Sequence, residues 1–335
     1  MLAPARARIN RSALTAGRGT PTQSILIGAA TLFAPIAARA HHPGAGAEQG
    51  WNAEGWVVGL LALALLGYVV GVGRLWRRAG TARGIGWREV VCFATGWSTL
   101  ATALASPVDS LGAVLFSMHM VQHELLMVVA APLLVLSRPL EAWVWALPAT
   151  RRPAIVGAFR SPVPLALWDI STSPRGAWLF HAMVVWAWHV PVLFEAGLRS
   201  EAIHALQHAS FLTSALCLWW TVLHAERAGT HTSGALASVF TTMLHTGALG
   251  ALLTFSRHAW YPDYQGYGGL TALEDQQLGG LVMWAPAALP YLAAGLWLLG
   301  RYLDATAPSV TCRGSRAPSV HGSQPRQPPH EALPR

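Results

Sequence analysis

The sequence predicts an all-α fold: a polytopic membrane helical bundle with seven transmembrane helices after a signal peptide. Three observations lead to this prediction: a composition poor in charge, seven long apolar runs, and an uneven distribution of arginine among the segments that join those runs. Together they place most of the chain within a lipid bilayer.

The composition separates this chain from soluble proteins. Of its 335 residues, 53% are hydrophobic and only 11% are charged, and the mean hydropathy is +0.38. An ordinary soluble domain carries roughly 25% charged residues. Because so few polar side chains are present to cover a water-soluble globule, the composition argues against a soluble enzyme.

Each of seven apolar runs approaches the roughly 20 residues that an α-helix needs to cross a bilayer. The runs cover residues 56–76, 89–107, 113–137, 177–197, 202–224, 235–256 and 279–300. We expect one transmembrane helix in each, so that residues 56–300 form one membrane domain. The connector 138–176 is rich in proline, with Trp143 and Trp145 near its start, and predicts short amphipathic pieces at the membrane surface.

The N-terminal leader has the features of a secretory signal. Four arginines precede a short apolar run, residues 25–38, which ends in a small-residue pattern typical of a cleavage site, Ala38-Arg39-Ala40. We predict a signal peptide at 1–40 and a periplasmic segment at 41–55. The alternative is an uncleaved eighth span.

The arginines predict the orientation. All 23 cationic side chains are arginine, and sixteen lie in the last residues of the first span or in the segments after the first, third, fifth and seventh spans. Only Arg199 and Arg257 lie in the opposite connectors, and the rest lie in the leader. The positive-inside rule therefore predicts an outer N-terminus and a cytoplasmic C-terminus. The basic charge then reflects orientation and not binding to nucleic acid.

Two further expectations follow from composition. The absence of lysine excludes a retinal Schiff base, which requires a lysine amine. The C-terminal segment 301–335 is rich in Pro, Ser and Arg, and we expect a disordered cytoplasmic tail there.

Histidines inside the predicted spans are the strongest functional signal, because ionisable groups in a membrane are costly and are usually functional. His119 and His123 are four residues apart, as are His204 and His208, so each pair lies on one face of its helix. Both spans enter from the outer side, which places the two pairs at one depth. His189 belongs to a neighbouring span.

The sequence predicts that these groups hold copper, since imidazole is the commonest copper ligand and thioether sulfur selects Cu(I). The candidate ligands are His119, His123, His204, His208, His189, His245, Met118, Met120 and Met283, and the residues expected to orient them by hydrogen bonds to the free ring nitrogens are Gln122, Glu124 and Asp275. For a single histidine such as His245 or His181, the alternative is a hydrogen bond between helices.

Two features at other positions bear on metal binding. The three cysteines form no CxxC pair, which argues against a thiolate mechanism. Cleavage after Ala40 would make His41 the mature N-terminus, followed by His42, and a terminal amine with an imidazole can chelate copper.

Several motifs in order resemble a known family. They are MHMVQHELL at 118–126, WAWHVP at 186–191, HALQH at 204–208 and DQQLGG at 275–280. The chain resembles, over roughly residues 55–300, the multi-pass CtaG family of cytochrome c oxidase assembly factors. The resemblance implies a bacterial inner-membrane protein that works with subunits of the oxidase and helps to deliver its copper. It supplies no ligand set, so the metal site rests on spacing and depth.

Three functions compete at this point. The first is a copper-binding assembly factor for cytochrome c oxidase, which is not an enzyme. The second is a copper permease of the copper-resistance type, and the third is a membrane b-type cytochrome. Two imidazoles on one helix face cannot ligate opposite sides of one haem, which argues against the third.

Overall fold

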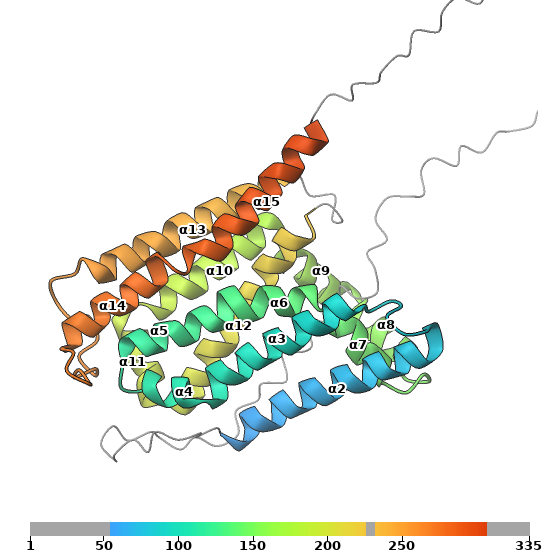
Figure 1. Cartoon of the computed structure of the whole chain (residues 1–335), viewed down its shortest axis with the longest axis horizontal. Helices are drawn as coiled ribbons and strands as arrows, with labels where there is room; N and C mark the ends of the chain where they lie inside the picture. The colour runs from blue at the N-terminus through green and yellow to red at the C-terminus, as the bar shows by residue number, and fades with distance from the viewer. Residues whose placement is uncertain (1–53, 226–231, 307–335) are drawn as a thin grey trace, which may run out of the picture.

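A computed structural model describes residues 54–225 and 232–306, and within those ranges the chain is helical and forms no strand (Figure 1). The predicted signal peptide, His41 and His42 lie outside the described residues. Most of the predicted tail also lies outside them, although its first residues, 301–306, continue the last helix.

The helices follow one another with short connections. In chain order they are α2 (Gly55–Ala79), α3 (Trp87–Ala105), α4 (Pro107–Gly112), α5 (Phe116–Glu124), the π-helical η2 (Leu125–Ala130), α6 (Ala131–Leu136), α7 (Pro139–Ala146), α8 (Arg152–Phe159), α9 (Pro162–Ser171), α10 (Pro174–Trp188), α11 (Pro191–Arg199), α12 (Glu201–Leu223), α13 (Thr232–Thr254), α14 (Ala272–Trp284) and α15 (Ala288–Thr306).

Four helical stretches are long and apolar enough to cross a membrane: Gly55–Ala79, Phe116–Leu136, Thr232–Thr254 and Ala272–Asp304. A fifth is formed by α10 and α11 together, if this pair, bent by 75°, is one span. The described residues therefore contain four or five clear membrane spans, not clearly the seven expected.

The other two predicted spans also form helices, but they are not among these stretches. α3 covers most of run 89–107, and its first turn contains Arg88 and Glu89. α12 covers nearly all of run 202–224 and carries two histidines and Gln207. Polar side chains lower the hydropathy of a helix whatever its surroundings, which is why these two are not counted among the clear spans.

Two of the expected spans contain irregular turns, and each of these lies beside a proline. Pro132 has no N–H to donate to the preceding turn, and the helix passes through the π-helical η2 immediately before it. Pro191 begins α11 after an extended Val190, so the expected span 177–197 is broken just after His189. Such breaks in a helix are common at functional sites.

The connector 138–176 forms three short helices, α7, α8 and α9, as its prolines predict. α7 packs closely on α2, because Gly71 leaves room for the backbone of Ala142. The Trp143 indole also donates a 3.0 Å hydrogen bond to the Ala64 carbonyl of α2. Trp143 therefore joins two helices.

The run α5–η2–α6 lies at the centre of the molecule, where it contacts α3, α12 and α14 (Figure 1). α14 packs tightly on both of its neighbours through adjacent glycines. Gly279 faces the Phe116 ring of α5, and Gly280 faces Gly250 of α13. Small residues permit this close approach in membrane bundles.

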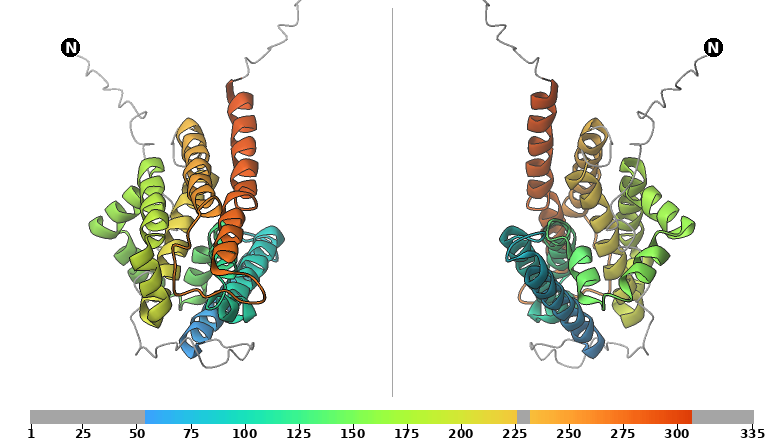
Figure 2. Two further views of the ribbon diagram at one scale, coloured as in Figure 1. Left: turned by 90° about the vertical axis from the view of Figure 1, so that its left-hand side faces the viewer. Right: turned by 90° about the vertical axis from the view of Figure 1, so that its right-hand side faces the viewer.

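The edges of the molecule are strongly apolar. α2 and α15 lie on opposite sides (Figures 1 and 2), and each exposes large side chains, including Leu63 and Leu66 on α2 and Leu296 on α15. In water such surfaces would be costly, whereas lipid tails solvate them well. The chain is thus a helical membrane protein with a polar site inside.

Candidate metal centre

α5 presents His119 and His123 to the interior of the bundle. Their ring centres are 4.4 Å apart, as expected for residues one helical turn apart, and each side chain is only 1% exposed. Because buried polar groups normally have hydrogen-bond partners, two buried imidazoles side by side indicate a specific site.

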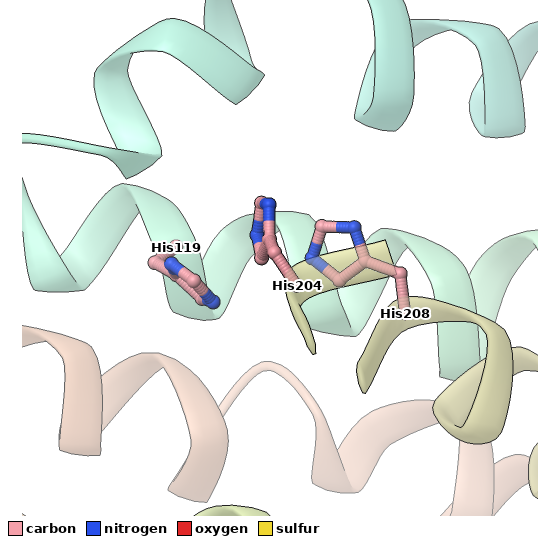
Figure 3. A group of neighbouring side chains, drawn as sticks. All are labelled: His119, His204 and His208. Carbon is pink, nitrogen blue, oxygen red and sulfur yellow. The ribbon is translucent and has the colours of Figure 1, made fainter. Parts of the chain in front are cut away.

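α12 supplies the second pair from the facing side. The rings of His204 and His208 are 4.1 Å apart, and His119 lies 5.3 Å from His204 and 6.0 Å from His208 between ring centres. One ring nitrogen from each of these three residues lies within 4.8 Å of the other two. Figure 3 shows the three rings turned toward one another between α5 and α12.

His189 brings a third helix to the site. It follows the last residue of α10, and its ring centre lies 6.4 Å from that of His123. The five-histidine cluster is defined here as His119, His123, His189, His204 and His208. The structure therefore joins both predicted pairs and His189 in one place.

The orientation of His119 is fixed by a loop that is distant in sequence. The Tyr264 hydroxyl donates a 2.8 Å hydrogen bond to the Gly112 carbonyl and lies 3.1 Å from His119 Nδ1. Since that hydroxyl has one proton, Nδ1 must be the donor in the second contact. The Nε2 of His119 then has a free lone pair, and it is buried without a hydrogen-bond partner.

Tyr264 keeps its proton in this position. Burial raises the pKa of its phenol well above the ordinary value, and the negative charge of Asp275 raises it further. The hydroxyl is consequently neutral at physiological pH and remains able to donate to Gly112.

Aromatic rings enclose the cluster. Phe194 lies 5.0 Å from His119 and Phe211 lies 4.5 Å from His123, between ring centres, while Phe116 and Tyr261 stack 4.9 Å apart on the same side as Phe194. These rings keep the surroundings of low polarity, which favours neutral imidazoles over charged ones. Neutral imidazole is the form that binds metal.

The residues expected to orient the rings make other contacts. Asp275 accepts hydrogen bonds from the backbone N–H groups of Phe116 (2.6 Å) and Ser117 (3.0 Å), and from the Ser117 hydroxyl (2.5 Å). Asp275 thus caps the N-terminus of α5. The unsatisfied N–H groups there attract its carboxylate more strongly than a neutral imidazole would attract it.

Among the described residues, Gln122 and Glu124 also make no hydrogen bond to a ring nitrogen of the cluster. Gln122 donates to the Ala103 carbonyl (2.8 Å) and to Asp109 (2.7 Å), which joins α5 to α3 and α4. Glu124 is half-buried at the end of α5.

The methionines have mainly packing contacts. Met120 and Met283 are buried in the main apolar core, and Met120 packs against Gly279 of α14. Met118 is half-buried, and as a direct neighbour of His119 in a helix it points to a different face. Their predicted role as sulfur ligands stays a prediction.

His245 is not part of the five-histidine cluster. Its Nδ1 accepts a 3.3 Å hydrogen bond from the Trp186 indole, and its ring lies 6.0 Å from Trp178. A neutral ring that accepts at Nδ1 carries its proton on Nε2, so this nitrogen has no lone pair for a metal. The alternative noted for a single histidine, a hydrogen bond between helices, describes His245 well.

Sequence reasoning missed two residues of the site. Gln207 is 1% exposed, both of its polar atoms lack a hydrogen-bond partner, and Gly197 of α11 leaves room for its amide. Its position three residues after His204 was the available signal. Tyr264 gave no signal, because its contact with His119 joins residues 145 positions apart.

The fold and site together define a class: a helical membrane protein with a buried cluster of imidazoles between its helices. More particularly, the chain belongs to the family of cytochrome c oxidase caa3 assembly factors, Caa3_CtaG, which it matches over residues 66–305.

The chain is also similar to uncharacterised mycobacterial proteins. Mb0105 of Mycobacterium bovis is 24% identical over 251 residues, and ML1998 of Mycobacterium leprae is 26% identical over 271 residues. These alignments cover 72% and 73% of this chain but only 38% of each relative, so the chain spans well under half the length of the curated relatives that it matches. No solved structure matches it.

Proposed function

We propose that this protein binds copper in the five-histidine cluster and delivers it to a caa3-type cytochrome c oxidase during assembly. The observation that carries the proposal is the group of ring nitrogens from His119, His204 and His208, all within 4.8 Å of one another. Family membership supports a role in oxidase assembly. Copper is the cargo, and holding and releasing it requires no catalysis.

The chemistry of the cluster supports copper as the cargo. Imidazole nitrogens suit copper and zinc, and metal-bound histidines usually donate their second ring nitrogen to a carbonyl or carboxylate. In His119 this second nitrogen is Nδ1, which donates to the Tyr264 hydroxyl, and that hydroxyl donates to the Gly112 carbonyl. His189 Nδ1 likewise donates to the Val185 carbonyl at 2.7 Å.

Seven spans and a bacterial inner-membrane location complete the proposal. The N-terminus is periplasmic, the C-terminus is cytoplasmic, and residues 1–40 are a signal peptide. α5 and α12 both begin at the periplasmic side, so His119 and His204 are reached first by copper from the periplasm. The oxidase subunit that receives the copper contacts the protein within the bilayer.

A deletion strain tests this function. Loss of the gene is expected to lower oxidase activity and oxidase copper, with haem content measured separately and with partial rescue by added copper. Wild-type protein should restore activity at low copper, and a His204→Asn variant should not. His258→Asn, a change of an exposed histidine in the α13–α14 loop, is the matched control and should restore activity. Normal oxidase in the deletion strain would refute the proposal.

One observation favours a copper permease as the second candidate. His181 Nε2 and Thr242 Oγ1 are buried without hydrogen-bond partners on α10 and α13, and His181 lies about 12 Å along α10 from His189 at 1.5 Å per residue. Polar atoms thus continue beyond the cluster. Uptake of copper into sealed vesicles that contain the purified protein would support this candidate, and its absence would leave the assembly role.

A further inference from the structure

Building on the proposed copper-binding function, we propose that the five-histidine cluster is two adjacent metal stations. The first station is formed by His119, His204 and His208, and the second by His123 and His189. Each station takes one soft monovalent cation, so that a saturated chain holds two ions.

His123 has the clearest need for a ligand. It is 1% exposed, and neither of its ring nitrogens has a hydrogen-bond partner. One of these nitrogens can carry the proton of the neutral ring, but the lone pair on the other is buried and unused. Leaving such a group unsatisfied is costly, and a bound cation would remove that cost.

His189 presents a matching lone pair. Its Nδ1 lies 2.7 Å from the Val185 carbonyl, and since a carbonyl only accepts, Nδ1 carries the proton. The Nε2 atom therefore has the lone pair, and it is buried without a hydrogen-bond partner. The side chain is 3% exposed.

The separation of the two ring centres matches the spacing of two imidazoles that bind one ion from opposite sides. A metal–nitrogen bond of about 2 Å, with about 1.2 Å from a ring nitrogen to the ring centre, places each ring centre about 3.2 Å from the ion. Two imidazoles on opposite sides of one ion are then about 6.4 Å apart between centres. The observed separation of His123 and His189 is 6.4 Å.

This geometry selects the kind of cation. Zn²⁺ in proteins almost always has four ligands, whereas two opposed imidazoles suit a monovalent ion of low coordination number such as Cu(I) or Ag(I). The three-histidine station is closer to the start of α5 and α12. His123 lies 4.4 Å from His119 and 5.3 Å from His208 between ring centres, so an ion can pass between the stations while imidazoles remain within reach.

Metal stoichiometry of the purified full-length chain tests this inference. Ag(I), which does not change oxidation state under these conditions, is titrated into the protein in detergent, and the retained silver is measured by mass spectrometry. We expect two ions per chain for the wild type, one for His189→Asn, and one for the double variant His204→Asn/His208→Asn, which leaves only His119 in the first station. His258→Asn removes an exposed histidine outside the cluster and should leave two.

X-ray absorption of the singly loaded variants identifies the remaining station. His189→Asn should retain a three-nitrogen site, and His204→Asn/His208→Asn a two-nitrogen site. If His189→Asn melts far below the wild type, His123→Asn empties the same station from a different helix.

The outcomes separate this inference from the function on which it rests. A wild-type chain that retains one ion overturns the two-station arrangement and leaves copper binding in place. A wild-type chain that retains none overturns both.

Discussion

At the scale of single residues, the site depends on side chains that hold the imidazoles in one orientation. Tyr264→Phe removes the hydroxyl that lies 3.1 Å from His119 Nδ1 and donates to the Gly112 carbonyl, so Nδ1 keeps only its longer, 3.4 Å contact with that carbonyl. We expect Cu(I) affinity to fall by about 10–100-fold, the usual effect of losing such a partner. Competition with a chromophoric Cu(I) chelator measures the change.

Tyr267→Phe is the matched control for Tyr264→Phe, because Tyr267 belongs to the same loop but is 41% exposed. The Cu(I) affinity of Tyr267→Phe should equal that of the wild type. Unchanged affinity in Tyr264→Phe itself would show that His119 needs no such partner.

A second residue-scale prediction concerns Asp275, whose carboxylate caps α5 from a segment far along the chain. Asp275→Ala leaves the N–H groups of Phe116 and Ser117 buried without an acceptor, at a cost of about 1–3 kcal/mol for each group. We expect a clearly lower melting temperature in detergent, with a smaller loss for Asp275→Asn, which retains one oxygen. Asp304→Ala, at an exposed position of α15, should melt like the wild type.

At the scale of helices, close packing through glycine keeps α14 in contact with α13. A Cβ atom at Gly280 would lie 2.6 Å from the Gly250 carbonyl oxygen and 2.6 Å from the Thr254 nitrogen, both of which are backbone atoms that cannot rotate away. Gly280→Ala should therefore destabilise the protein by about 1–3 kcal/mol, as measured by thermal melting in detergent.

Gly300→Ala, in the neighbouring helix α15, is expected not to destabilise the protein. A Cβ at Gly300 meets no atom within 4 Å, and alanine has a higher helix propensity than glycine by about 1 kcal/mol. This variant should melt at or slightly above the wild-type temperature. Equal melting temperatures for Gly280→Ala and Gly300→Ala would show that α13 and α14 can move apart without loss of stability.

Helix positions were predictable because apolar runs are local, whereas interruptions depend on packing. The runs at 56–76 and 235–256 became α2 and α13, both straight candidate spans. The π-helical turn before Pro132 and the break after His189 are less visible in composition. The runs 113–137 and 177–197 were expected to be uninterrupted. Their geometry also depends on partners such as Trp219, whose indole donates to the Met127 carbonyl inside η2 at 2.8 Å.

The candidate site was predictable to the extent that it follows helical spacing. The pairs His119–His123 and His204–His208 came from i, i+4 spacing, and equal depth followed from the orientation of the spans. Contacts between distant segments were not predictable. Asp275 was expected to bind an imidazole but binds the α5 N-terminus, and His245 was expected near the cluster but is turned toward Trp186.

At the scale of the whole molecule, the arrangement of charge and the two less apolar helices bear on how many times the chain crosses the membrane. Most of the arginines in the described residues lie near the ends of α2, α6–α9 and α15. These positions are in or beside the connectors assigned to the cytoplasm. α3 and α12 must also cross if the periplasmic and cytoplasmic connectors are to alternate. The polarity of α12 is then explained by its histidines, which face the interior and not lipid.

Reporter fusions test this seven-span topology. Fusions of alkaline phosphatase, active only outside the cytoplasm, should be active after residues 113, 200 and 265 and inactive after 81, 150 and 229, and green fluorescent protein should give the reverse pattern. The decisive pair is 200 and 229, which flank α12. Equal activity of phosphatase at both positions would mean that α12 does not cross, and the histidines of α12 would then reach the cluster from a helix that enters and leaves on one side.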